Sequence, residues 1–112
     1  MNRQRYITVP LDKEAIEAYD MGEEEIENSL QWVLIGEEFD VLNNSDVFKQ
    51  INNECGVIID DYESEIIQGN NLVKAYKIIC LFNEQAPSSI NEKLKIYIET
   101  ALDKNTLIAF DF

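Results

Sequence analysis

The segment spanning residues 90–102 constrains the fold of this chain more than any other, because it predicts a long amphipathic helix. Its apolar residues recur at the spacing of one helical face and are Ile90, Leu94, Tyr97, Ile98, Ala101 and Leu102. Ser89, with Glu92 three positions later, has the pattern of a capping box at a helix start. The neighbouring segments must supply a core that covers this apolar face.

Two segments beside this helix predict further elements of that core. Residues 72–82 predict a largely buried helix, whose apolar face carries Leu72, Ala75, Tyr76, Ile79 and Phe82. A break at residues 85–87 separates the two helices. Residues 106–112 are nearly all apolar or aromatic and predict a strand, with successive side chains on opposite faces.

The beginning of the chain predicts a short strand and a short helix. Residues 6–9 are rich in β-branched side chains and end at Pro10, which is typical of a strand at a sheet edge. Asp12 is the expected cap of the helix that follows, and Gly22 lies near its end.

Two more helices are predicted before residue 57. Three glutamates at 23–25 precede apolar residues at i, i+4, i+7 and i+8, which predicts an amphipathic helix that ends at Gly36. Trp32 falls just off its apolar face. Ser45 is the expected cap of a helix over residues 47–55, and Gly56 ends it.

These elements predict an α+β fold that is mainly α, a bundle of about four to five helices with a small sheet that pairs the N- and C-terminal strands. The chain has 112 residues, of which 46% are apolar. This size and composition fit one domain spanning residues 1–112.

The absence of histidine excludes several classes of enzyme and metal site. Ser-His-Asp and Cys-His nucleophiles need an imidazole, as do histidine-containing zinc sites. Cys55 and Cys80 are too few for a four-thiolate site or a disulfide framework, and their apolar neighbours predict buried, reduced thiols. We therefore expect no enzyme activity, no cofactor and no metal.

Charge is distributed very unevenly along the chain, whose formal net charge is −13. Residues 12–65 contain 17 acidic residues against Lys13 and Lys49, whereas residues 66–112 contain five acids and five lysines. Such a field repels nucleic acid and anionic lipid, and it speeds the approach of a basic partner. The charge therefore predicts a basic protein as partner, with no direct nucleic-acid binding and no membrane association.

The most crowded acidic group lies in residues 57–67, with the sequence VIIDDYESEII. Its carboxylates are Asp60, Asp61, Glu63 and Glu65, with Tyr62 among them. The run fits a strand and a helix face equally well, so its structure stays open. Carboxylates this close repel one another, which calls for a positive partner or for solvent on every side.

Three interpretations of this group compete with protein binding. A calcium loop does not fit, because counting from Asp61 places Ile66 where glycine is needed and Leu72 where glutamate is needed. Paired carboxylates can cleave glycosides, but nothing in the sequence supplies a substrate groove. A solvated acidic face is the plain alternative.

The interpretation that predicts a function is an acidic face that binds a basic protein, with an aromatic residue as a possible anchor. The predicted partner-binding residues are Asp60, Asp61, Tyr62, Glu63, Glu65, Glu37, Glu38 and Asp40.

The chain resembles the small acidic immunity proteins of bacterial toxin and immunity pairs, including those of contact-dependent growth inhibition. The resemblance rests on residues 60–65, the helix pair that follows and the closing strand at 107–112. It implies a protein that binds a cognate toxin domain, often a basic nuclease, and neutralises it.

The predicted function is accordingly a cytoplasmic immunity protein that binds a toxin domain through its acidic face. The alternative is an acidic adaptor, regulatory or DNA-mimic protein that binds a basic host protein. Both explain the charge, and neither requires catalysis. The start of the chain lacks the apolar segment of a signal peptide, which predicts a cytoplasmic location.

Overall fold

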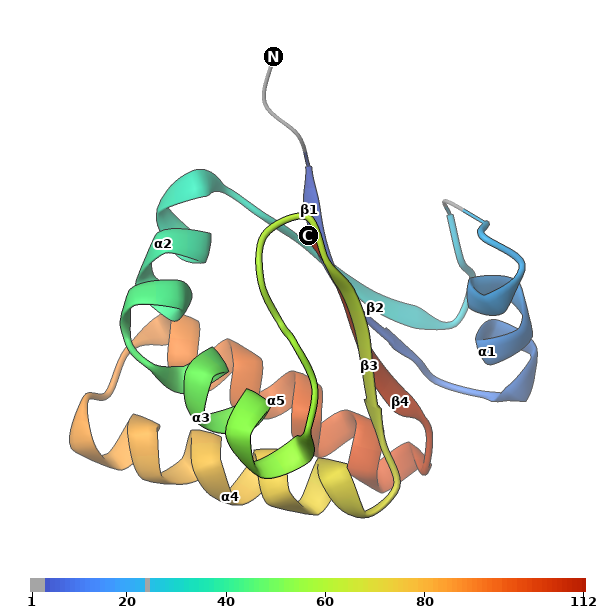
Figure 1. The fold of residues 1–112 in the computed structure, drawn as a ribbon. Coiled ribbons are helices and arrows are strands. Elements are labelled where there is room, and N and C mark those ends of the chain that lie inside the picture. The colour runs from blue at the N-terminus through green and yellow to red at the C-terminus, as the bar shows by residue number, and fades with distance from the viewer. Residues whose placement is uncertain (1–3, 24) are drawn as a thin grey trace.

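The computed structural model describes residues 4–23 and 25–112, and Figure 1 shows how this part of the chain folds. Its five helices and four strands follow in the order β1 (Arg5–Pro10), α1 (Lys13–Asp20), β2 (Ser29–Leu34), α2 (Gly36–Asn44), α3 (Val47–Cys55), β3 (Ser64–Gln68), α4 (Asn70–Gln85), α5 (Ser89–Lys104) and β4 (Leu107–Asp111).

All four strands join one antiparallel sheet in the order β2-β1-β4-β3. β1 pairs with β2 along its whole length and with β4 on its other side, where Ile7 lies opposite Phe110. β4 also pairs with β3, where Ile108 lies opposite Ile67. The last strand is therefore central, which explains why nearly all of its residues are apolar.

The helices cover the two faces of the sheet unequally. α5 packs on β1 and β4, α4 packs on α5 and β3, and α3 packs on α4. In Figure 1, α2 to α5 lie on one side of the sheet, whereas α1 lies on the other side and contacts β1. One sheet face is thus buried under the helical layer, and the opposite face is only partly covered.

Aromatic rings fill the centre of the layer between sheet and helices. Phe110 of β4 packs edge-on against Phe48 of α3 and Phe112, with ring centroids 5.7 and 5.9 Å apart. Phe112 in turn packs against Phe39 of α2 at 5.1 Å. Edge-to-face pairs of this kind add to the hydrophobic gain from burial.

The predicted fold class is wrong in its sheet and in its arrangement of the helices as a bundle. The terminal strands do pair, but β2 and β3, from the middle of the chain, join them in a sheet of four strands. The helices form a layer on this sheet and not a bundle around their own core. β2 and β3 were not predicted because their stability as strands depends on hydrogen bonds and burial supplied by β1 and β4, which are distant in the sequence.

The helix predicted between residue 23 and Gly36 is also wrong, because residues 29–34 form the strand β2. Trp32 is only 3% exposed and points into the core, where its ring meets Tyr97 of α5 at 5.8 Å. Gly36, expected as a helix end, is instead the first residue of α2, a helix that was not predicted from the sequence.

The other predicted helices are confirmed, with small differences at their ends. Asp12 caps α1 by accepting a hydrogen bond from the Ala15 amide, and Gly56 ends α3 in a left-handed conformation. Ser88, and not Ser89, caps α5. The hydroxyl of Ser45, the expected cap of α3, donates to the carbonyl of Leu42 at the end of α2.

Of the segment left open, residues 57–63 form a loop and residues 64–67 belong to the strand β3. Ile59 is buried in this loop and exchanges two hydrogen bonds with the side chain of Asn52 on α3. Cys55 and Cys80 are free thiols, but both are half-buried and not buried as expected. Among the described residues, no helix has the length and apolar character needed to cross a bilayer.

Candidate functional site

The predicted acidic group at residues 60–65 is not one continuous patch. Asp60 is exposed and accepts a hydrogen bond from the Asp61 amide. Glu63 is exposed just before β3, whereas Glu65 lies on β3 opposite Phe110, on the face of the sheet that carries the helices. The strand alternation therefore separates the last carboxylate from the others.

Asp61 has a positive partner within the protein. Arg5 of β1 donates from Nε and Nη2 to the two carboxylate oxygens of Asp61, at 3.0 and 2.9 Å. The guanidinium also lies 4.2 Å from the centre of the Phe39 ring on α2. The hydrogen bond to Asp61, with further support from Asp40, raises the pKa of Arg5. This carboxylate holds the loop against β1 and α2.

Replacing Asp61 by asparagine is expected to lower the free energy of unfolding by about 1–2 kcal/mol, because it removes a charge-assisted, bidentate pair. Urea unfolding followed by circular dichroism measures the change. Glu63→Gln is the control, since Glu63 is exposed and the substitution alters net charge equally. An equal midpoint for the Asp61 variant and the unaltered protein would show that the pair contributes nothing.

Tyr62 stands at the tip of the same loop. Its side chain is 80% exposed, and its backbone has the left-handed φ of 67° that aromatic residues rarely adopt. The structure thus presents a large aromatic surface next to Asp60 and Glu63. Its role as an anchor for a partner stays a prediction.

The second predicted group lies on α2, near the same arginine. Glu37 and Asp40 are exposed, and the charge of Asp40 acts on Arg5. Glu38 instead accepts a hydrogen bond from the Ile35 amide at 2.9 Å and closes the start of α2. Of the eight predicted residues, Glu38 and Asp61 therefore serve the fold, and the exposed members remain available to a partner.

A second acidic surface, not predicted from the sequence, is formed by α1 and the loop after it. We call it the α1 acidic surface, and its six exposed carboxylates belong to Glu14, Glu17, Asp20, Glu23, Glu25 and Glu27. Glu14, Glu23, Glu25 and Glu27 line one hollow of about 320 Å³ together with Asp12. Lys13 is the only basic residue between positions 12 and 28.

This surface was missed because Glu23 and Glu25 were interpreted as the first turn of a helix. They lie in a loop, which returns beside α1 because Asn28 adopts a left-handed φ of 55° and donates its side-chain amide to Asp12 at 3.0 Å. The Asn28 carbonyl also accepts from the Leu11 amide at 2.8 Å. Glu24, the middle glutamate, lies outside the described residues.

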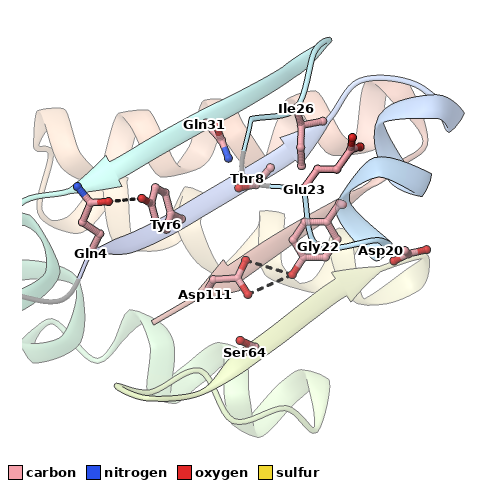
Figure 2. Close-up of a pocket in the computed structure, with 11 residues that line it drawn as sticks. Gln4, Tyr6, Thr8, Asp20, Gly22, Glu23, Ile26, Gln31, Ser64 and Asp111 are labelled. Carbon is pink, nitrogen blue, oxygen red and sulfur yellow. Dashed lines mark hydrogen bonds between the residues drawn. The ribbon is translucent and has the colours of Figure 1, made fainter.

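A pocket of about 640 Å³ lies beside this surface, on the sheet face opposite α4 and α5 (Figure 2). β1 contributes Tyr6 and Thr8 to its floor, and β4 contributes Asp111. α1 and its following loop form one wall, which includes Tyr19 and Glu23. Among the described residues, no group of three acidic or cysteine side chains is arranged to hold a metal ion.

Comparison with known proteins identifies a shared fold but no family. No protein-family model and no curated protein matches the chain. Among solved structures, Neisseria DNA mimic protein DMP12 is similar at a TM-score of 0.70, with 9% sequence identity over 98% of this chain and 100% of that chain. Identity this low shows that the two chains have the same fold, and no more.

Proposed function

We propose that this chain is an acidic DNA mimic that binds a DNA-binding protein and occupies its phosphate-contacting surface. The observation that carries the proposal is the segregation of charge on the fold. Carboxylates gather on α1, its following loop, α2 and the loop before β3, whereas on α4 and α5 the four carboxylates are balanced by the five lysines Lys74, Lys77, Lys93, Lys95 and Lys104.

This arrangement gives the molecule two acidic regions, because α1 and its following loop lie on one side of the sheet and α2 lies on the other (Figure 1). A surface that binds DNA is positive because it must hold phosphates, and fixed carboxylates satisfy the same field. Glu14 and Glu17 lie three residues apart on α1, where side chains are neighbours about 5–6 Å apart at their Cβ atoms. Like charges at this spacing repel each other. The binding of a basic partner that neutralises them is therefore favourable.

The likeness to the Neisseria DNA mimic supports the same function, because a protein named for imitating DNA has this fold over its whole length. It also corrects the partner predicted from the sequence: a DNA-binding protein replaces the toxin domain. The resemblance to immunity proteins is tested by none of the matches and stays a prediction. Absence of enzyme activity and a cytoplasmic location remain predictions as well.

A capture experiment with a DNA competitor tests the proposal. The protein is immobilised, exposed to nuclease-treated lysate of its source organism, and eluted with a mixed-sequence DNA duplex of about 20 base pairs. We expect the duplex to release one or a few DNA-binding proteins, because DNA and the mimic compete for the same basic surface. Fluorescence anisotropy with a labelled duplex then measures the displacement directly.

The competition step separates mimicry from simple attraction between opposite charges. Polyglutamate of matched charge is the control eluent, and it should release the same proteins at a charge concentration at least about tenfold higher, because its carboxylates are not fixed in place. If captured proteins resist the duplex, or if none binds DNA by itself, the chain is an acidic adaptor and not a mimic.

A further inference from the structure

The floor of the pocket on the open sheet face is formed by side chains of paired strands. Asp111 lies opposite Tyr6 of β1 and opposite Ser64 of β3 in the strand register, which places its carboxylate between two neighbouring strands. Figure 2 shows this carboxylate at the centre of the pocket, with Gln31 and Thr8 on the side of β1 and β2. The sheet holds these groups in place without help from a ligand.

The carboxylate of Asp111 is oriented by Tyr19 of α1. The tyrosine hydroxyl donates to it and lies 3.2 and 3.1 Å from its two oxygens. Burial, and then the charge of Asp111, raise the pKa of Tyr19, so the hydroxyl stays protonated at neutral pH. Since a carboxylate can accept about four hydrogen bonds, Asp111 keeps capacity for a further donor.

The described lining of the pocket is negative. It contains the carboxylates of Asp20, Glu23 and Asp111, and none of the described lining residues is a lysine or an arginine. Thr8, which is only 2% exposed, also lines this pocket.

We propose that this pocket binds an arginine side chain of the partner protein, and this inference rests on the proposed function. A guanidinium is planar and carries five donors, so it can pair with the Asp111 carboxylate while its face lies against the ring of Tyr6 or Tyr19. The side-chain oxygen of Gln4, which accepts from the Tyr6 hydroxyl, lies at the rim. A lysine ammonium would satisfy the charge but not the flat, aromatic walls.

An arginine site of this kind would give the mimic a specific contact with its partner in addition to its negative electrostatic field. Arginine is a residue with which DNA-binding proteins hold phosphates and bases. An arginine that enters this pocket cannot contact DNA at the same time. Exclusion of DNA would then follow from one defined side chain as well as from the overall charge.

Titration with Nα-acetyl-arginine amide, followed by ¹H–¹⁵N NMR, tests this inference without a protein partner. We expect the largest shifts at the amides of Thr8, Gln31 and Ser64, and at least about fivefold weaker binding of Nα-acetyl-lysine amide, since only the guanidinium matches the carboxylate in two hydrogen bonds. Asp111→Asn keeps the size of the side chain and should weaken arginine binding at least about tenfold.

Two further variants keep the result interpretable. Glu17→Gln removes the same charge from an exposed position that does not line the pocket, and it should change arginine binding less than about twofold. Ser64→Trp obstructs the pocket from an exposed position on β3 without changing net charge, and it should abolish binding even if Asp111→Asn fails to fold.

Equal weakening by Glu17→Gln, equal binding of the lysine amide, or no shifts at the pocket would each overturn the arginine site. These outcomes are separate from the capture experiment. DNA displacement without arginine-induced shifts at the pocket would refute the pocket but leave the mimic, whereas arginine binding with no displacement of DNA would refute the mimic but leave the pocket.

Discussion

Replacing Phe110 by alanine is expected to lower the free energy of unfolding by about 3–5 kcal/mol, the largest effect on stability that we predict. Phe110 is fully buried on the central strand β4, and its ring contacts both Phe48 and Phe112. Its removal would leave a cavity between sheet and helices that neither layer can close, because β1 and β3 fix β4 on both sides. The loss is a large part of the about 5–15 kcal/mol that stabilises a domain.

Thermal and urea unfolding of this variant should agree. The melting temperature should fall by about 10–20 °C, given the enthalpy typical of a domain this size. Leu81→Ala is the matched control, because Leu81 on α4 is apolar but 56% exposed, and its removal should cost less than about 1 kcal/mol. Similar losses in the two variants would contradict a core centred on Phe110.

Neutralising the α1 acidic surface is expected to slow association with the DNA-binding partner by about tenfold or more at low salt. The variant replaces Glu14, Glu17, Glu23 and Glu25 by glutamine, which removes four charges from exposed positions. Folding should be unaffected, since none of these side chains makes a described hydrogen bond or ion pair. Stopped-flow or surface plasmon resonance at several salt concentrations measures the association rate.

A matched variant decides which acidic surface binds. It replaces Glu37, Asp40, Asp60 and Glu63 by their amides and so removes the same four charges from the surface predicted by the sequence. If the two variants slow association equally, only the total charge matters. A larger effect of the second variant would return the binding site to Tyr62 and its neighbours, and would contradict the α1 acidic surface.

The helical layer could be predicted from the sequence, because α4 and α5 carry their own pattern. Their apolar residues repeat at helical spacing over about three turns, and turn residues separate them. Local signals therefore suffice for elements whose hydrogen bonds are all within one segment. α2 was missed because only Phe39 and Leu42 are buried on it, too few to establish a period.

β2 could not be recognised for a physical reason. Leu30, Trp32 and Leu34 alternate as in a strand, yet Leu30 and Leu34, four positions apart, also fit one face of a helix. The choice between strand and helix is decided by β1, which supplies backbone hydrogen bonds along the whole length of β2. The sequence of one segment contains no information about a partner that lies about 20 residues away.

The same limit explains what was missed in the candidate site. The sequence predicted crowded carboxylates in need of a cation, and Arg5 is that cation for Asp61. It could not show that this pairing takes Asp61 out of the binding surface, nor that α1 would bring Glu14 beside Glu25. Both depend on how β1 sits in the sheet. The density of acids at residues 12–27 was the one signal that could have indicated the second surface.

The carboxylate of Glu65 has a further consequence, for self-association. β3 is the outermost strand on its side of the sheet, and an unpaired strand invites a second copy to extend the sheet. Glu65 puts a charge on the helix-covered face of this strand, where an added strand would have to bury it without a cation. The charge of Glu65 thus opposes the addition of a second copy at the edge of β3. The acidic surfaces of the monomer then stay available to a different protein.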